Sequence, residues 1–112
     1  MNRLIVLIGA TAVGKSEAAM WLAERFSCEI VSGDSMCVYR GLDIGTAKPT
    51  AEDRRRIPHH LIDILNPEEP FSVVDFQRLA TEAIADINRR GRIPLLVGGT
   101  GLYVQALLEG YR

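Results

Sequence analysis

The sequence predicts an α/β fold, in which a parallel sheet has helices packed on its faces. Short apolar runs alternate along the chain with longer segments in which apolar residues recur every three or four positions. These are the patterns of buried strands and amphipathic helices. The first run, residues 4–8, is apolar throughout rather than at alternate positions, which is typical of a strand covered on both faces of a parallel sheet. No repeat or linker divides the 112 residues, so we expect one domain.

The first part of the chain has the order of a βαβ unit. We expect a strand at residues 4–8, a loop of small residues at 9–14, a helix at 15–26 and a second strand at 28–32. Apolar residues at helical spacing between Ala19 and Phe26 predict the helix. A βαβ unit joins two parallel strands, so this segment begins the sheet.

The rest of the chain continues the alternation. Glycine and proline punctuate residues 39–58, where we expect a polar helical turn at 51–56. A third strand is predicted at 59–65, where apolar residues alternate loosely. Ser72 and Asp75 have capping-box spacing and predict the start of a long helix, and Gly91 predicts its end. A fourth strand at 93–97, a glycine loop at 98–101 and a last helix at 102–108 follow.

Composition and charge limit the class of protein. Hydrophobic residues make up 47% of the chain and charged residues 24%, as in soluble globular proteins and unlike disordered ones. Because the net charge is −1, a nucleic acid would be bound by local patches rather than by bulk positive charge. The run at 4–8 is shorter than a signal-peptide core, and no run is long enough to span a membrane. We therefore expect a cytoplasmic protein with reduced thiols at Cys28 and Cys37.

One segment fits the phosphate-loop pattern G-x-x-x-x-G-K-[ST]: Gly9, Ala10, Thr11, Ala12, Val13, Gly14, Lys15 and Ser16. Its glycines let backbone N–H groups converge on one anion, and the following helix adds the positive end of its dipole. Lys15 would bind terminal phosphate oxygens, and Ser16 would bind Mg²⁺. The pattern predicts a P-loop NTPase-like fold that binds ATP, another nucleotide or a prenyl diphosphate. A glycine turn with a solvent-exposed lysine is the alternative.

Asp34 follows the second predicted strand, at the end of a parallel sheet where ligands bind. Beside a phosphate loop, its carboxylate could bind Mg²⁺, act as a general base or cap its own loop. The strand at 93–97 is followed by Gly98, Gly99 and Thr100, whereas a nucleotide hydrolase has an aspartate there. These glycines indicate either the close approach of another molecule or a tight turn. Thr100 can form a hydrogen bond there.

Four further blocks accompany the phosphate loop: GDS at 33–35, VYRGLDIGTAKP at 38–49, PHHLID at 58–63 and LVGGTGLY at 96–103. In this order and spacing, the blocks and the loop resemble the tRNA dimethylallyltransferases, also called the tRNA isopentenyltransferase family. Together they span nearly the whole chain. The family often has proline where this chain has Ala12 or a neighbouring small residue, and no phosphate contact depends on that ring.

The resemblance implies transfer of the prenyl group of dimethylallyl diphosphate to the exocyclic amine of the adenosine next to the tRNA anticodon. Asp34 matches the family's proposed general base, and the phosphate loop with Mg²⁺ on Ser16 would hold the diphosphate. The positions that match tRNA-contacting ones are Asp34, Ser35, Met36, Cys37 and Thr100. The partners would be dimethylallyl diphosphate and the anticodon stem-loop of tRNA, without a membrane, and the full-length enzyme could be a monomer.

Other classes of protein stay open. A phosphate-loop kinase of a small metabolite would consume ATP without tRNA, and a non-catalytic phosphate-binding module would bind diphosphates without turnover. The resemblance also implies a considerably longer protein, and the predicted strands are fewer than the about five or six of a typical sheet. We therefore expect residues 1–112 to be the N-terminal part of a phosphate-binding domain, with an incomplete sheet, an exposed edge and possible inactivity on its own.

Side chains outside these blocks carry weaker predictions. The arginines at 54–56 and 89–92 would contact RNA phosphates or, more simply, lie in solvent. His59 and His60 are neighbours on a predicted strand and would point to opposite faces, so packing and local hydrogen bonds suit them better than a shared metal. Trp21 is expected to be partly buried on the first helix.

Overall fold

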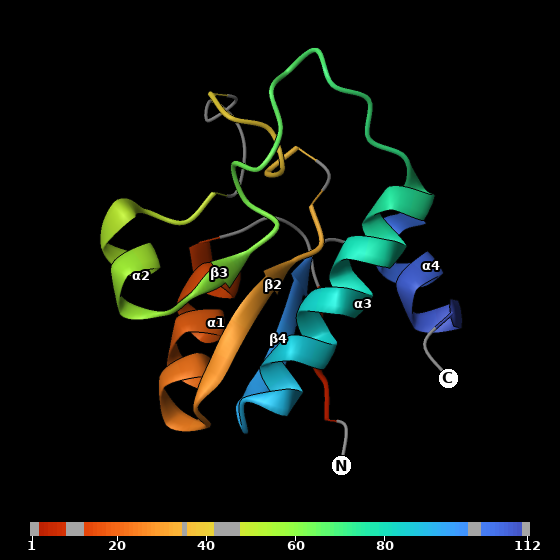
Figure 1. The fold of residues 1–112 in the computed structure, drawn as a ribbon. Helices are drawn as coiled ribbons and strands as arrows, with labels where there is room; N and C mark the ends of the chain where they lie inside the picture. Colours follow the sequence, from red (N-terminus) through yellow and green to blue (C-terminus); the bar gives the residue numbers. More distant parts are fainter. Residues whose placement is uncertain (1–2, 9–12, 35, 42–47, 99–101, 111–112) are drawn as a thin grey trace.

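The computed structural model describes residues 3–8, 13–34, 36–41, 48–98 and 102–110. At its centre lies a parallel four-stranded sheet with the strand order β1-β4-β2-β3 (Figure 1). The strands are β1 (Ile5–Ile8), β2 (Cys28–Ser32), β3 (His59–His60) and β4 (Ile93–Gly98). The predicted α/β fold with a parallel sheet is confirmed.

Helices cover both faces of the sheet: α1 (Val13–Arg25) covers one, and α3 (Val73–Arg89) with α4 (Leu102–Gly110) covers the other. The short α2 (Ala51–Arg56) contains no buried residue and lies beside β3. Successive side chains of a strand point to opposite faces, so neighbouring residues of β2 and β4 belong to different cores. Ile30 and Leu95 pack with α1, whereas Val31 and Leu96 pack with α3 and α4. Figure 1 shows α1 on one side of the sheet and α3 with α4 on the other.

The ends of α3 follow from local chemistry. The Ser72 hydroxyl accepts a hydrogen bond from the Asp75 backbone N–H at 3.2 Å, and the Asp75 carboxylate accepts one from the Ser72 N–H at 3.0 Å. This is the predicted capping box, which satisfies N–H groups that the first turn of a helix leaves unpaired. Gly91 has a φ of +81°, a conformation that glycine adopts without strain, and it follows the end of the helix as predicted.

The third strand is shorter than predicted. We expected a strand at 59–65, but β3 contains two residues, His59 and His60. Leu61 and Asp63 have φ values of +67° and +56°, which a strand cannot accommodate. The backbone pairs again further on, where Leu65 forms an isolated parallel bridge with Tyr39. The loose alternation of 59–65 did not reveal this interruption.

The outer parts of the sheet are less buried than expected. β1 forms an edge among the described residues, and its side chains are half-buried or, at Ile8, exposed.

Trp21, on α1, is 59% exposed, with the Arg25 guanidinium 5.5 Å from the centre of its ring, so the expectation of a partly buried tryptophan is wrong. No described helix is long and apolar enough to cross a membrane.

Candidate active site

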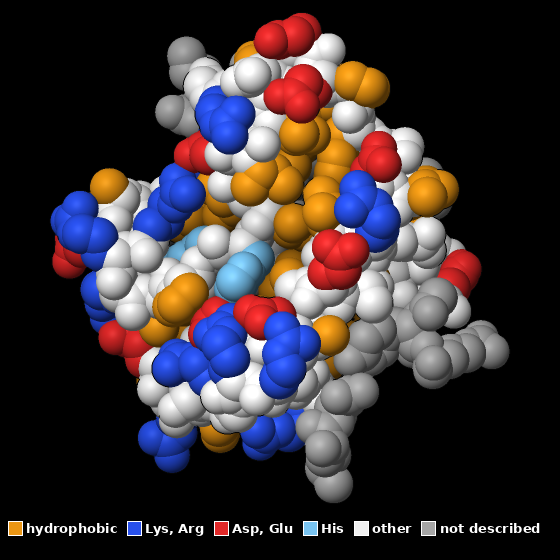
Figure 2. Space-filling model, in the orientation of Figure 1, with side chains coloured by type: hydrophobic (Ala, Val, Ile, Leu, Met, Phe, Trp, Pro, Cys, Tyr) orange, Lys and Arg blue, Asp and Glu red, His pale blue; other side chains and the backbone are white. Residues whose placement is uncertain are grey.

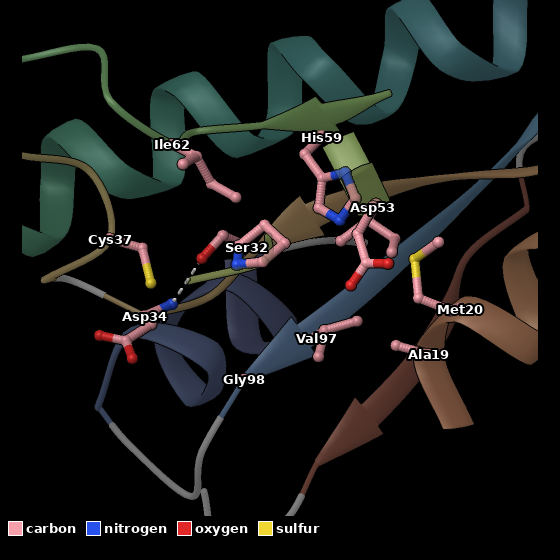
Figure 3. Close-up of a pocket in the computed structure, with 12 residues that line it drawn as sticks. Ala19, Met20, Ser32, Asp34, Cys37, Asp53, His59, Ile62, Val97 and Gly98 are labelled. Atoms are coloured by element: carbon pink, nitrogen blue, oxygen red, sulfur yellow. Dashed lines mark hydrogen bonds between the residues drawn. The ribbon is translucent and has the colours of Figure 1, made fainter. Parts of the chain in front are cut away.

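A cavity of about 60 Å³ lies beneath the carboxyl ends of β2 and β4, on the α1 face of the sheet (Figure 3). Its walls are mainly apolar, and a few polar side chains reach it from β2, β3, α2 and the turn after β2. The lining residues are Ala19, Met20, Ile30, Ser32, Asp34, Cys37, Pro49, Asp53, His59, Ile62, Val97 and Gly98. An apolar cavity with a few converging polar groups is the usual form of a small-molecule site.

Asp34 lies at this cavity in a tight turn. Its Oδ1 accepts a hydrogen bond from the Met36 N–H at 2.9 Å, and its own N–H donates to the Ser32 hydroxyl at 3.3 Å. The carboxylate therefore caps its own loop, as one interpretation of the sequence proposed. Asp34 lines the cavity, but in Figure 3 its carboxylate extends away from Ser32 and His59. Within the described part of the chain no cation pairs with it. Asp34 is half-buried, and its carboxylate has a backbone N–H partner and no described salt bridge.

The Cys37 thiol stands beside Asp34 in the same cavity. Burial, and then the negative charge of Asp34, raise its pKa to about 11. The thiol is therefore protonated at neutral pH and acts as a small polar wall rather than as a nucleophile. Cys28, on the opposite end of β2, is likewise a buried free thiol whose pKa is raised by burial.

Gly33 and Gly98 lie where the ends of β2 and β4 and the helix α4 leave no room for a Cβ. A Cβ at Gly98 would lie 3.2 Å from the Gly33 Cα and 2.9 Å from the Val104 Cγ2. The Gly33 N–H also donates to the Val97 carbonyl at 2.8 Å. The close approach that Gly98 indicated in the sequence is therefore made by this chain's own backbone and by α4. It draws together the two strand ends that border the cavity.

His59 points into the cavity from β3 (Figure 3). Its Nδ1 is 2.7 Å from the Ile57 carbonyl, which fixes the proton of the neutral ring on Nδ1 and leaves Nε2 as an acceptor. Burial lowers the pKa of His59, so the ring is neutral at pH 7. We predicted only packing and local hydrogen bonding for this residue. Its parallel register with Ile30, which puts both side chains on the cavity face, could not be inferred from sequence.

The other end of β2 carries a second carboxylate with very different surroundings. Glu29 is 2% exposed and pairs with Arg90, Arg92 and His60. Hydrogen bonds from Arg90, more than any other contact, lower its pKa to about 2. Figure 2 shows basic and acidic side chains gathered next to a histidine on this face. Arg90 and Arg92 therefore have partners within the chain rather than lying free in solvent.

The predicted site residues divide into those in the turn after β2, those in the first turn of α1, and those outside the described part of the chain. Asp34 and Cys37 meet at the cavity, whereas the Met36 side chain is 47% exposed. The backbone of Val13 to Ser16 forms the first turn of α1, which contains no acidic residue, and strand β1 precedes the loop as predicted. The remaining predicted residues lie outside the described residues: Gly9, Ala10, Thr11, Ala12, Ser35 and Thr100. The side chains of Val13, Lys15 and Ser16 are also outside the description.

Comparison with known proteins places the chain in a family. The model of the family described as IPP transferase matches residues 37–112, and that of isopentenyl transferase matches residues 2–63. The chain belongs to the IPP transferase family. This agrees with the resemblance that the sequence blocks indicated.

Individual members of the IPP transferase family are similar along the whole chain. A tRNA dimethylallyltransferase of Halalkalibacterium halodurans is 58% identical over 110 residues, which are 98% of this chain and 35% of that protein. The crystal structure of a full-length tRNA isopentenylpyrophosphate transferase from Bacillus halodurans has a TM-score of 0.92 at 56% identity, and covers 100% of this chain and 37% of that one. A eukaryotic dimethylallyltransferase acting on tRNA has a TM-score of 0.88 at 40% identity, over 96% of this chain and 27% of that one.

The chain thus spans about a third of the length of the curated relatives that it matches. Its interpretation as the N-terminal part of a phosphate-binding domain stays a prediction.

Proposed function

We propose that the protein transfers a dimethylallyl group from dimethylallyl diphosphate to the exocyclic amine of the adenosine next to a tRNA anticodon. The observation that carries this proposal is the position of Asp34. Asp34 follows the carboxyl end of β2 and is one of the residues that line an apolar cavity. Residues of α1, the helix that follows the phosphate-loop sequence, line the same cavity. The reaction requires a proton acceptor and a site that binds diphosphate. In this proposal both lie at the carboxyl ends of the strands.

The chemistry assigns a task to each part. The amine nitrogen forms a bond to C1 of the dimethylallyl group, the C1–O bond breaks, and diphosphate leaves with the electron pair. The Asp34 carboxylate accepts the proton that the amine loses. Backbone N–H groups of the loop, Thr11 and Lys15 would stabilise the charge on the departing diphosphate. The adenine must leave its stack to reach Asp34, at a cost of a few kcal/mol.

Mg²⁺ fits this arrangement as an ion held chiefly by the diphosphate. No group of three or more His, Cys, Asp or Glu side chains that could hold a metal occurs among the described residues. Mg²⁺ commonly takes most of its ligands from phosphates and water, with few from the protein. We propose Ser16 as the protein ligand, and when bound there Mg²⁺ would neutralise negative charge on the leaving group.

We further propose that tRNA contacts Asp34, Ser35, Met36, Cys37 and Thr100, and that the enzyme acts in the cytoplasm. The contact at Met36 is supported by its exposed side chain, which belongs to the same turn as Asp34. The mainly apolar walls of the cavity suit a hydrocarbon group better than a second charged metabolite.

The test is prenyl transfer by the longest product of the gene that encodes this chain. This product is incubated with Mg²⁺, dimethylallyl diphosphate and unmodified tRNA, and the nucleosides are analysed by mass spectrometry. We expect prenylated adenosine from the parent protein and from Glu82→Gln, a surface control, but strongly reduced product from Asp34→Asn. ATP consumption without tRNA would instead support a small-metabolite kinase. Diphosphate binding without turnover would support a non-catalytic module.

A further inference from the structure

The turn that contains Asp34 is attached to a distant part of the chain. Beyond the ends of β2 and β3, the backbone around residues 37–40 pairs with residues 63–65 through four hydrogen bonds of 2.8 to 3.0 Å. These bonds are Asp63 N–H to Cys37 O, Ile64 N–H to Val38 O, Leu65 N–H to Val38 O and Arg40 N–H to Leu65 O. The segment after Asp34 therefore takes its position from the segment at 63–65.

Lys48 binds both of these segments at once. Its side chain is 8% exposed, and its Nζ donates to the Asp63 Oδ1 at 2.6 Å and to the Tyr39 carbonyl at 2.7 Å. A buried ammonium group is stable only when such partners replace water. Because one acceptor belongs to each segment, the two hydrogen bonds of the ammonium group link residues 37–40 to residues 63–65.

Asp63 has a left-handed backbone conformation. Its φ of +56° lies in a region that few residues other than glycine adopt, although aspartate tolerates it better than most. The hydrogen bond from Lys48, followed by one from Arg54, lowers the pKa of its carboxyl group, so it stays charged. Arg54 reaches the same carboxylate at 2.6 Å, but its side chain is 37% exposed, and no described contact joins it to residues 37–40.

We propose that Lys48 and Asp63 are positioning residues that orient the Asp34 carboxylate for proton transfer. The inference rests on the proposed function. The connection runs from the Lys48 ammonium to Asp63, and from the Asp63 N–H to the Cys37 carbonyl. Cys37 in turn donates its N–H to the Asp34 carbonyl at 3.2 Å. Loosening the Lys48–Asp63 pair would let the turn move and would misplace the carboxylate relative to the amine.

Kinetics of the whole gene product test this role. Lys48→Met removes the charge and keeps the aliphatic stem, Asp63→Asn keeps the shape of the side chain, and Arg54→Met is the matched control. We expect kcat to fall roughly 10- to 100-fold in the first two variants, as for a misplaced catalytic group, with KM for dimethylallyl diphosphate unchanged. Arg54→Met should stay within about threefold of the parent protein. Equal effects of all three substitutions, or a parallel loss of diphosphate binding, would overturn the proposal.

Hydrogen exchange tests the same pair without relying on activity. In Lys48→Met and Asp63→Asn, the amides of residues 37–41 and 63–65 should exchange faster than in Arg54→Met, while those of α3 stay protected. Unchanged exchange would overturn the proposal even if transfer is slowed. If the parent protein shows no prenyl transfer, the proposed function fails, and faster exchange would then leave the pair as a purely structural contact. Using two variants keeps the test decisive if one does not fold.

Discussion

Glu29 and Asp34 are carboxylates at the two ends of one strand and its turn, yet they have opposite surroundings. Glu29 is 2% exposed and has Arg90, Arg92 and His60 around it. Asp34 is half-buried, and its carboxylate is hydrogen-bonded to the Met36 backbone N–H. Removing a carboxylate from water costs free energy unless cations compensate for the lost hydration. Arg90 and Arg92 provide this compensation for Glu29.

The difference indicates how the two groups can be used. With its pKa lowered to about 2, chiefly by hydrogen bonds from Arg90, Glu29 is a very weak base whose contacts join β2 to β3 and to the segment between α3 and β4. Asp34 has fewer partners and is one of the residues that line the cavity. We infer that the amino end of β2 stabilises the fold and the carboxyl end carries the chemistry.

Asp34→Asn should have the largest effect on activity and almost none on the fold. The amide keeps an oxygen for the Met36 N–H but cannot accept a proton from the amine. We expect kcat for prenyl transfer to fall roughly 10²- to 10⁴-fold, and the free energy of unfolding to change by less than about 0.5 kcal/mol. Steady-state kinetics and urea unfolding measure the two quantities. Activity within threefold of the parent protein would remove Asp34 as the base.

Glu29→Gln should lower the stability of the fold and leave activity almost unchanged, which is the opposite of Asp34→Asn. The substitution leaves Arg90 and Arg92 without their buried counter-charge, so we expect a loss of about 3 kcal/mol in the free energy of unfolding. Prenyl transfer at temperatures where the variant is folded should be nearly unchanged. Because the folded-state pKa of Glu29 lies below its ordinary value, its stabilisation is complete above about pH 4.5 and is lost as the pH falls toward 2. Unfolding curves at pH 7 and pH 3 should therefore differ less in the variant than in the parent protein.

Gly98→Ala tests whether Gly98 is needed for close packing at the carboxyl ends of β2 and β4. The new Cβ would meet the Val104 Cγ2 at 2.9 Å and the Gly33 Cα at 3.2 Å. Overpacking of this kind costs about 1 to 3 kcal/mol, which thermal unfolding can measure. Adding Val104→Ala should restore part of the loss, since it removes the nearer contact. Independent, additive effects of the two substitutions would contradict the packing role of Gly98.

The smallest effect concerns His59 and pH. Burial holds the pKa of His59 below its ordinary value of 6.5, and the nearby Arg54 charge acts in the same direction. The unfolded chain therefore binds the proton more readily, and stability should decline as the pH falls below about 6.5. In His59→Gln this decline should be weaker, as judged from melting temperatures between pH 5 and pH 8. An identical pH profile in the variant would show that His59 is not buried as a neutral ring.

Much of the fold was predictable because its signals are local. The capping box of Ser72 and Asp75 joins residues three positions apart, and the βαβ order of the first segment follows from apolar periodicity. The short β3 was not predictable from 59–65, because the left-handed backbone at Asp63 accompanies its ion pair with Lys48, fifteen positions away. Likewise, a sequence pattern does not place Arg90 on Glu29, since 61 positions separate them.

For the candidate site, the sequence determined the chemical parts: a phosphate-loop pattern between a strand and a helix, and Asp34 after the next strand. These follow from residue types and short-range spacing. Tertiary structure decided their arrangement. It placed His59 in the cavity through the register of β3 with β2, brought Gly33 against Gly98 and tied the Asp34 turn to Asp63. Contacts of this kind depend on which strands become neighbours, and strand order arises from the packing of the whole sheet rather than from any one segment.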